Sequence, residues 1–144
     1  MKVVNKVYPN KSQLEGFLEP GTEGPICMVN LLKFKERAEY EDGRETDLTG
    51  REACQLYEEG ITKLLQQAGG YVGYTSDVQR LALGEVEELW DAVVLAVWPS
   101  RQAMLEVMQS EAMQEISVHR TAGLAGQLNI ETVGLSGQWL SGDS

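Results

Sequence analysis

Two short segments of the chain are apolar at nearly every position, and they constrain the fold more than any other feature. The segments are PICMVNLLKF at 25–34 and LWDAVVLAVW at 89–98. Each is too short and too continuously apolar for a surface helix, so each is predicted to be a strand that is buried on both faces. A chain built on such strands must find apolar cover for both faces of its sheet.

The segment from Gly50 to Ala68 has the clearest helical pattern. Thr49 and Glu52 have the spacing of a capping box, in which each side chain accepts a hydrogen bond from a free backbone N–H at the helix start. Gly69 and Gly70 then end the helix. Its apolar stripe, with the spacing of one buried face, comprises Ala53, Leu56, Tyr57, Gly60, Ile61, Leu64, Leu65 and Ala68.

The order of the remaining elements predicts the fold class. Strands are expected at 70–78, 89–98 and 126–135, and helices after Ser100 and from 110 to about 122. Strand, helix, strand, strand, helix, strand is the order of the α+β, ferredoxin-like split βαβ sandwich, an antiparallel sheet with helices on one face. A short strand and helix in 1–24 precede this unit and a tail at 136–144 follows it, so we expect a single domain over 1–144.

The two apolar strands are expected to pair antiparallel, with residue numbers that sum to 124. This register places Lys33 opposite Asp91 and Phe34 opposite Trp90, so that charge meets charge and ring meets ring. Helices cover only one face of such a sheet. A second copy of the same sheet is the simplest cover for the other face, which predicts a homodimer.

Charge and composition exclude several classes of partner. The net charge of −10 disfavours nucleic acid and anionic membrane surfaces. No apolar run approaches the ~20 residues that span a bilayer. The start, MKVVNKVYPN, lacks the apolar core of a secretory signal, so a cytoplasmic location is expected. Cys27 and Cys54 are expected to be reduced, buried thiols.

Most motifs for cofactors and metals are missing from the sequence. It contains no P-loop, GxSxG or HExxH motif, and its glycines do not open a helix after a strand in the dinucleotide-binding pattern. A single histidine cannot build the usual multi-histidine metal site. We therefore expect neither a bound cofactor nor a metal.

Five segments together carry a resemblance to a known family. PICMVNLLKFK, TGREACQLYEEG, QQAGGYVGYTSDV, LWDAVVLAVWPSRQAM and HRTAGLAGQL resemble the bacterial domain-of-unknown-function family thirteen-thirty, within the dimeric α+β-barrel superfamily. The resemblance implies a homodimer in which two sheets close into a barrel. It leaves the activity open, because that superfamily includes cofactor-free monooxygenases, isomerases, dehalogenating and lactone-forming enzymes, and haem-handling proteins.

Three polar side chains in apolar surroundings are candidate ligand-binding residues. Asn30 sits in mid-strand and must find partners, either backbone groups or a ligand. Tyr57 lies on the inward stripe of its helix, either packed in the core or beside a cavity. Asp91 either pairs with Lys33 across the strands or acts as a general base.

His119 and Arg120 are adjacent near the end of a predicted helix, just before the last strand. Helical spacing turns His119 inward or to the rim. It is either a helix cap, stabilised by the macrodipole, or the acid/base of a pocket to which Arg120 contributes. In the family resemblance the His-Arg pair recurs at this place, which favours the pocket.

Three functional readings remain open. The first is a cofactor-free enzyme, similar to a monooxygenase or isomerase, that acts on a small hydrophobic or carbonyl-bearing molecule between sheet and helices, with His119 as acid/base. The second is a module that binds such a molecule without turnover, and the third is a purely structural dimer. The acidic segment 35–47 is expected to be an exposed, mobile loop near the helix start and over the pocket.

Overall fold

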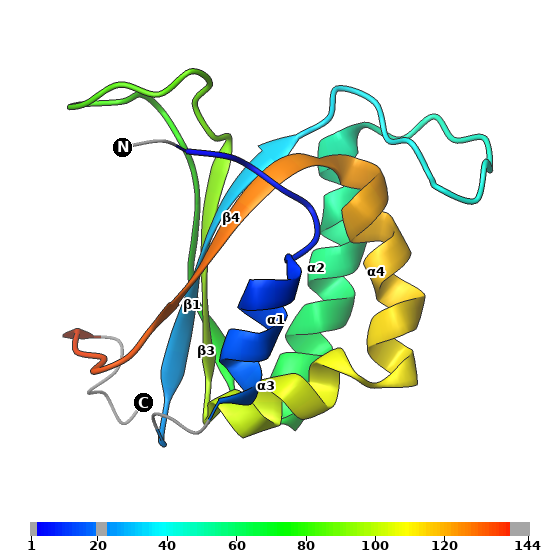
Figure 1. The fold of residues 1–144 in the computed structure, drawn as a ribbon. Coiled ribbons are helices and arrows are strands. Elements are labelled where there is room, and N and C mark those ends of the chain that lie inside the picture. The colour runs from blue at the N-terminus through cyan, green and yellow to red at the C-terminus, as the bar shows by residue number, and fades with distance from the viewer. Residues whose placement is uncertain (1–2, 20–22, 139–144) are drawn as a thin grey trace.

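The computed structural model describes residues 3–19 and 23–138. The chain forms a four-stranded sheet with helices against one of its faces (Figure 1). The elements in chain order are α1 Lys11–Leu18, β1 Ile26–Phe34, α2 Gly50–Gln67, β2 Tyr71–Asp77, β3 Ala92–Trp98, α3 Arg101–Met108, α4 Glu111–Gly123 and β4 Leu124–Thr132.

The sheet has the strand order β2-β3-β1-β4, and every neighbouring pair is antiparallel. This is the ferredoxin-like split βαβ topology, so the predicted α+β fold class is confirmed. The register of β1 and β3 is confirmed as well, because Cys27 lies opposite Val97 and Leu31 opposite Val93. The paired residues run from Ile26 to Leu32, and Lys33 reaches Asp91 just beyond them, whereas the expected Phe34–Trp90 pair lies outside this ladder.

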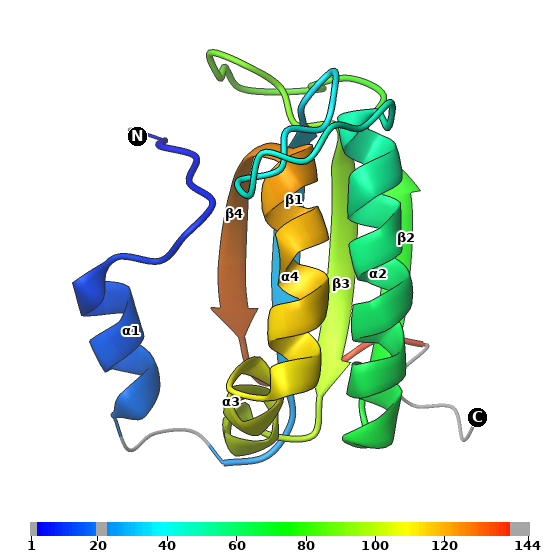
Figure 2. The ribbon, with the colours of Figure 1, turned by 90° about the vertical axis from the view of Figure 1, so that its right-hand side faces the viewer.

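The helices cover one face of the sheet, with α2 and α4 side by side across it (Figure 2). At one end of this layer Ile26, Met28 and Trp98 pack against Leu65 of α2 and Met104 of α3. At the other end Leu32 and Ala92 pack against Cys54 of α2 and Leu124. Alternate residues of each strand therefore face the helices, as the two-residue period of a strand requires.

The start of α2 forms the predicted capping box. The Thr49 hydroxyl accepts a hydrogen bond from the Glu52 backbone N–H at 3.1 Å, and the Glu52 carboxylate accepts one from the Thr49 N–H at 2.8 Å. One residue of the predicted stripe is wrong, because Leu56 is 41% exposed. It lies at the edge of the stripe, where the spacing of apolar residues does not show whether a side chain is buried or exposed.

Close packing of α2 and α4 depends on glycine. At Gly60 an added Cβ would lie 2.7 Å from Cγ2 of Ile116 on α4. At Gly123 it would lie 2.3 Å from the Gly50 carbonyl oxygen and 2.6 Å from Cys54 Sγ. The backbone of α4 contacts the backbone of α2 at Gly123, and the backbone of α2 contacts the Ile116 side chain at Gly60, which leaves no room for a side chain at either position.

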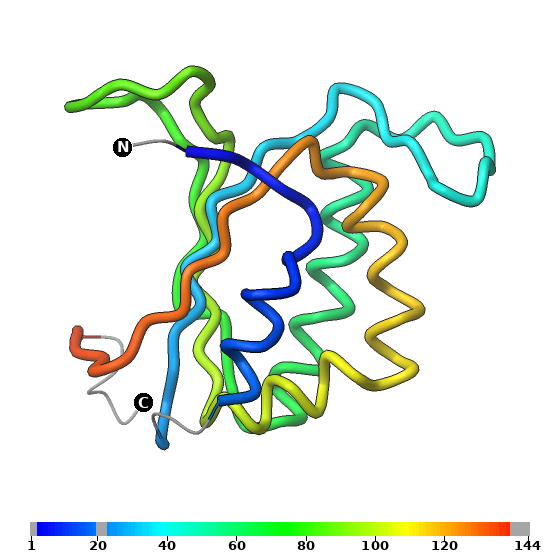
Figure 3. Tube along the Cα trace, viewed as in Figure 1, coloured from blue at the N-terminus to red at the C-terminus, as the bar shows by residue number. Residues whose placement is uncertain are grey.

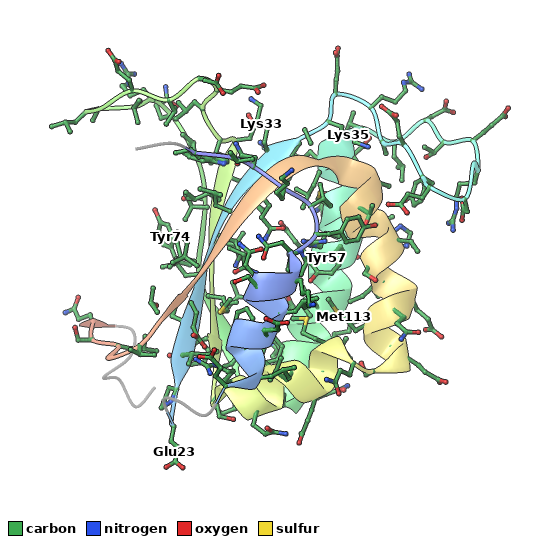
Figure 4. The ribbon with its side chains drawn as sticks, in the orientation of Figure 1. Glu23, Lys33, Lys35, Tyr57, Tyr74 and Met113 are labelled. Carbon is green, nitrogen blue, oxygen red and sulfur yellow. The ribbon has the colours of Figure 1, made fainter. Side chains whose placement is uncertain are left out.

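The opposite face of the sheet carries no helix. Its side chains include Val29 and Leu31 of β1, Val93 and Leu95 of β3, and Ile130 of β4. Ile130 is 46% exposed, and Tyr74 of β2, which projects away from the helices, is 49% exposed (Figure 4). We call this surface the bare face. It is apolar, as the two-sided apolarity of the strands predicted.

The loop of residues 35–49 projects beyond the ends of α2 and α4 (Figure 3). Most of its residues are exposed, as expected. Its stem is held in place, because Ala38 and Tyr40 are buried with Ala53 and Ala122. The Ala38 N–H also donates to the Leu48 carbonyl and the Glu39 N–H to the Ala122 carbonyl. Only the tip, residues 41–47, projects without buried apolar residues, and the mobility of this tip stays a prediction.

The segment before β1 differs from the predicted strand and helix. The helix is present as α1, but the strand is reduced to a single bridge between Lys6 and Gln127 on β4. The segment is instead held by side chains, since Trp90 Nε1 donates to Asn5 Oδ1 at 2.6 Å. Residues 136–138 of the predicted tail have no strand, and residues 139–144 lie outside the described part of the chain.

We predict that Gly123→Ala destabilises the protein by about 1–3 kcal/mol, because the new methyl group must displace the Gly50 backbone or the Cys54 side chain. The melting temperature should fall by several degrees in a thermal unfolding experiment. Gly16→Ala in α1 is the matched control. An added Cβ there meets nothing within 4 Å, so its melting temperature should stay the same or rise slightly. Equal melting of Gly123→Ala and wild type would contradict the close helix contact.

Candidate functional site

A chain of polar side chains crosses the otherwise apolar layer between sheet and helices. It begins at Asn30, in the middle of β1 on the helix-covered side. Asn30 Nδ2 donates to the Met28 and Val94 carbonyls at 3.1 and 3.2 Å, and Asn30 Oδ1 accepts from Gln127 Nε2 at 2.7 Å. The Asn30 side chain is therefore bonded to backbone carbonyls, which was one of its two predicted roles. Its Oδ1 connects β1 to the neighbouring strand β4.

Gln127 connects the sheet to α4. It lies on β4 and is only 8% exposed, and its Oε1 accepts from Arg120 Nη2 at 2.9 Å. The same Nη2 donates to the Val7 carbonyl at 2.9 Å. The sequence analysis did not find Gln127, although a glutamine on the inward face of a predicted strand is the same kind of signal that singled out Asn30.

Tyr57 completes this group from the α2 side. It is one turn from Cys54, which faces the sheet, and Figure 4 shows it on the helix side of the sheet. Burial raises the pKa of Tyr57 to about 12, although the nearby Arg120 charge opposes the shift. Within residues 3–19 and 23–138 its hydroxyl has no hydrogen-bond partner, so it is a free donor within range of the Arg120 charge.

The free donors in this group are open to solvent. In the described part of the chain, every side-chain nitrogen or oxygen that is sealed from solvent has a hydrogen-bond partner. Arg120 and Tyr57 are both partly buried. Their unpartnered atoms must therefore lie where water or a ligand can reach them.

A surface hollow of about 440 Å³ is connected to this group through Val7, although none of Asn30, Tyr57, Arg120 and Gln127 lines it. Val7 forms part of its wall, and its carbonyl accepts the bond from Arg120. Leu124, from the core end that includes Cys54, also lines it. Its lining residues are Asn5, Lys6, Val7, Tyr8, Lys35, Glu41, Thr121, Leu124 and Ala125.

Two further titratable side chains of α2 lie beside Tyr57. Burial raises the pKa of the Cys54 thiol to about 12, and the Glu58 charge adds to the shift, so this thiol is unreactive at neutral pH. Burial also raises the pKa of Glu58, against the opposing charge of Arg51. Glu58 has no ion-pair or hydrogen-bond partner in the described residues. The sequence analysis missed it, because a glutamate within a helix reads as a solvent-facing residue.

His119 lies apart from this group. Its Nδ1 is 2.7 Å from the Tyr40 hydroxyl, and the two rings meet edge to face. Burial lowers the pKa of His119, and the nearby Arg44 charge lowers it further. Among the described residues His119 forms no hydrogen bond with Asn30 or Tyr57, the residues with which it was predicted to assemble. Adjacent residues of a helix point about 100° apart, and Arg120 takes the inward position.

Asp91 takes the first of its two predicted roles. Its Oδ1 lies 3.4 Å from Lys33 Nζ, and its Oδ2 accepts from the Phe34 N–H at 2.9 Å. These bonds connect β3 to the end of β1. Asp91 forms no hydrogen bond with Asn30, Gln127 or Arg120 in the described residues.

Comparison with solved structures gives one close relative. A crystal structure of methylated RPA0582 protein is 31% identical, covers 93% of this chain and 98% of its own, and superposes with a TM-score of 0.83. The chain belongs to the RPA0582 family. A second structure of RPA0582, described as a protein of unknown function from Rhodopseudomonas palustris, is 28% identical over 93% of this chain and all of its own, with a TM-score of 0.82.

A further comparison of this RPA0582-family chain gives a distant similarity. A dabb family protein with a ferredoxin-like fold from Mesorhizobium loti is 11% identical, covers 79% of this chain and 100% of its own, and has a TM-score of 0.47. Comparison with family models and with curated proteins gives no match. No helix among the described residues of this family member is long and apolar enough to cross a membrane.

In this RPA0582-family member, we predict that the single histidine titrates below its usual pKa of 6.5. Because the unfolded chain then binds the proton more tightly than the folded protein, stability should fall as the pH drops from 6.5 toward the folded-state pKa. Proton NMR of the imidazole measures the pKa directly. Arg44→Gln should raise it but leave it below 6.5, because burial is the larger cause, and Arg37→Gln is the control. A wild-type pKa of 6.5 or higher would contradict the prediction.

Proposed function

We propose that this protein binds a small hydrophobic or carbonyl-bearing molecule between its sheet and its helices. The observation that carries the proposal is the group formed by Arg120, Tyr57, Gln127 and Asn30, a polar site with unpartnered, solvent-reachable donors inside an apolar layer. Binding sites are mostly apolar with a few well-placed polar groups, which fits this arrangement. The hollow beside Val7 is the proposed entrance.

A cofactor-free enzyme is the second candidate, and Glu58 is the observation that favours it. A carboxyl group with a raised pKa whose charge acts on Tyr57 is suited to move a proton. The catalytic role proposed for His119 requires a ligand that reaches one particular ring nitrogen. Its Nδ1 already contacts Tyr40, so only Nε2 is left to exchange a proton with a ligand.

We further propose that the protein belongs to the bacterial domain-of-unknown-function family thirteen-thirty and works in the cytoplasm. The quoted sequence segments and the similarity to RPA0582 support the first part. Two free, buried cysteines are consistent with the second, since reduced thiols are usual in that compartment.

The proposed oligomer is a homodimer joined through the bare face. Apolar side chains occupy this face across β1, β3 and β4, and an uncovered apolar sheet face is a favourable interface. The β2–β3 loop adds to the surface on this side. It projects past the bare face (Figure 1), and its Leu83 is 88% exposed.

We predict that Leu95→Glu, in the middle of the bare face, converts the dimer to a monomer of 15.9 kDa, because the new carboxylate would be buried unpaired in the interface. Sedimentation at micromolar concentration measures the mass. Val118→Glu on α4, where the valine is 40% exposed on the helix side, should stay dimeric. A monomeric wild type would refute the proposed dimer.

A second prediction tests the binding site. Ala125→Trp should abolish binding of the neutral dye Nile red, because Ala125 is an exposed residue that lines the hollow and an indole there would fill the entrance. Ala112→Trp on the exposed side of α4 is the control and should bind as wild type does. Fluorescence titration measures the affinity, and unbiased native mass spectrometry of the purified protein shows whether a ligand copurifies. No dye binding by wild type, together with no copurified ligand, would refute the proposed site.

A further inference from the structure

We infer that the molecule bound at this site carries a carboxylate, held by Arg120 and by the Tyr57 hydroxyl. The inference rests on the proposed site and names the chemical class of its ligand. It follows from the state of Arg120, from the position of Tyr57 and from the charges around both.

Arg120 is a cation whose charge is not matched by the protein. A guanidinium has five N–H donors, and in the described residues Arg120 uses two of them, both on Nη2. Both acceptors, the Val7 carbonyl and Gln127 Oε1, are neutral. No carboxylate of the described chain lies within 4 Å of this guanidinium, whereas Arg44, Arg51 and Arg101 each have an acidic partner.

A partly buried cation is stabilised when an anion pairs with it, since an unpaired charge loses part of its hydration. The three N–H groups on Nε and Nη1 of Arg120 are left for that anion, and they are reachable by solvent. Carboxylates and phosphates are the small anions whose oxygens fit such donors, and of the two a carboxylate carries a single charge. The site is therefore suited to an oxyanion and less suited to a purely apolar molecule.

Tyr57 provides a second donor for the same group. Its hydroxyl has no partner in the described chain, and it is close enough to Arg120 for that charge to affect it. The phenol keeps its proton at neutral pH and can donate a hydrogen bond to a carboxylate oxygen. Asn30 does not compete for this role, because both Nδ2 hydrogens donate to backbone carbonyls.

The surrounding charges decide how large the anion can be. Lys6 and Lys35 line the hollow together with one acid, Glu41, so the entrance carries a local excess of positive charge in a chain of net charge −10. On α2, the partly buried Glu58 carries a charge that acts on Tyr57 and disfavours a second negative group. Val7, Leu124 and Ala125 offer apolar contacts. These features favour a monoanion with an apolar body.

The test compares matched pairs of carboxylates and carboxamides, with benzoate and benzamide, phenylacetate and phenylacetamide, and octanoate and octanamide as probes. Affinity is measured by ligand-observed NMR and by displacement of Nile red. In wild type, at least one carboxylate should bind about tenfold or more tightly than its amide, as a hydrogen-bonded charge pair implies. In Arg120→Met the difference should disappear while Nile red still binds.

Three further variants separate the contributions. Tyr57→Phe removes only the hydroxyl and should weaken carboxylates severalfold without changing the amides. Arg120→Lys retains the charge and should keep part of the preference, which matters if Arg120→Met fails to fold. Arg80→Met removes an exposed cation from the β2–β3 loop and is the matched control, with affinities equal to those of wild type.

Two results would overturn the inference. The first is equal affinity for acids and amides in wild type. The second is a carboxylate preference that survives in Arg120→Met but is lost in Lys6→Met/Lys35→Met, which would assign it to the lysines at the entrance. In both cases binding of Nile red or of the amides shows that the proposed site exists. Failure of every probe and of the dye would instead refute the proposed function itself.

Discussion

The antiparallel pairing of β1 with β3 is the interaction on which the rest of the structure depends. These strands form the centre of the sheet, and their register determines which side chains face the helices and which form the bare face. A shift of one residue would move Asn30 to the bare face and bring Val29 under the helices. The Lys33–Asp91 contact and the bond from the Phe34 N–H to Asp91 oppose such a shift at the end of the ladder.

The last turns of α4 connect three parts of the molecule. Arg120 reaches the sheet through Gln127 and the N-terminal segment through Val7. His119 reaches the loop of residues 35–49 through Tyr40, and the Gly123 carbonyl accepts from the Lys35 N–H. One short stretch of helix thus holds the inner polar group, one wall of the hollow and the loop that projects beyond the helices. Two adjacent residues divide these roles because a helix turns by about 100° per residue.

The two faces of the sheet are suited to different tasks. The helix-covered face carries the polar group inside an apolar layer, whereas the bare face is apolar throughout its centre. Both faces share the backbone of β1, so a partner that orders the bare face would also stiffen the strand that carries Asn30. The interface and the site are then neighbours across a single layer of sheet, about the thickness of one strand.

Local pattern alone was enough to predict most of the fold. The capping box at Thr49 and Glu52, the apolar stripe of α2, the Ser100 cap and the β1–β3 register are properties of single elements or of two strands with complementary residues, and each was found where it was predicted. The buried, free state of Cys27 and Cys54 follows from the same patterns. Such patterns were less accurate at two places. Leu56 lies at the margin of the helical stripe and is exposed. The segment around Lys6 is held by side chains and forms a single bridge in place of the predicted strand.

The composition of the site was decided by tertiary structure. Asn30, Tyr57 and Arg120 could be named from the sequence as polar residues on inward faces, but their association through Gln127 could not, because it joins β1, β4 and α4. The same holds for Glu58 and for the contact of His119 with Tyr40, residues 79 positions apart. Periodicity specifies the face of one helix or strand on which a residue lies. Which residue of another element meets it depends on the distance and angle at which the helices and strands pack. Only the folded chain sets these two quantities.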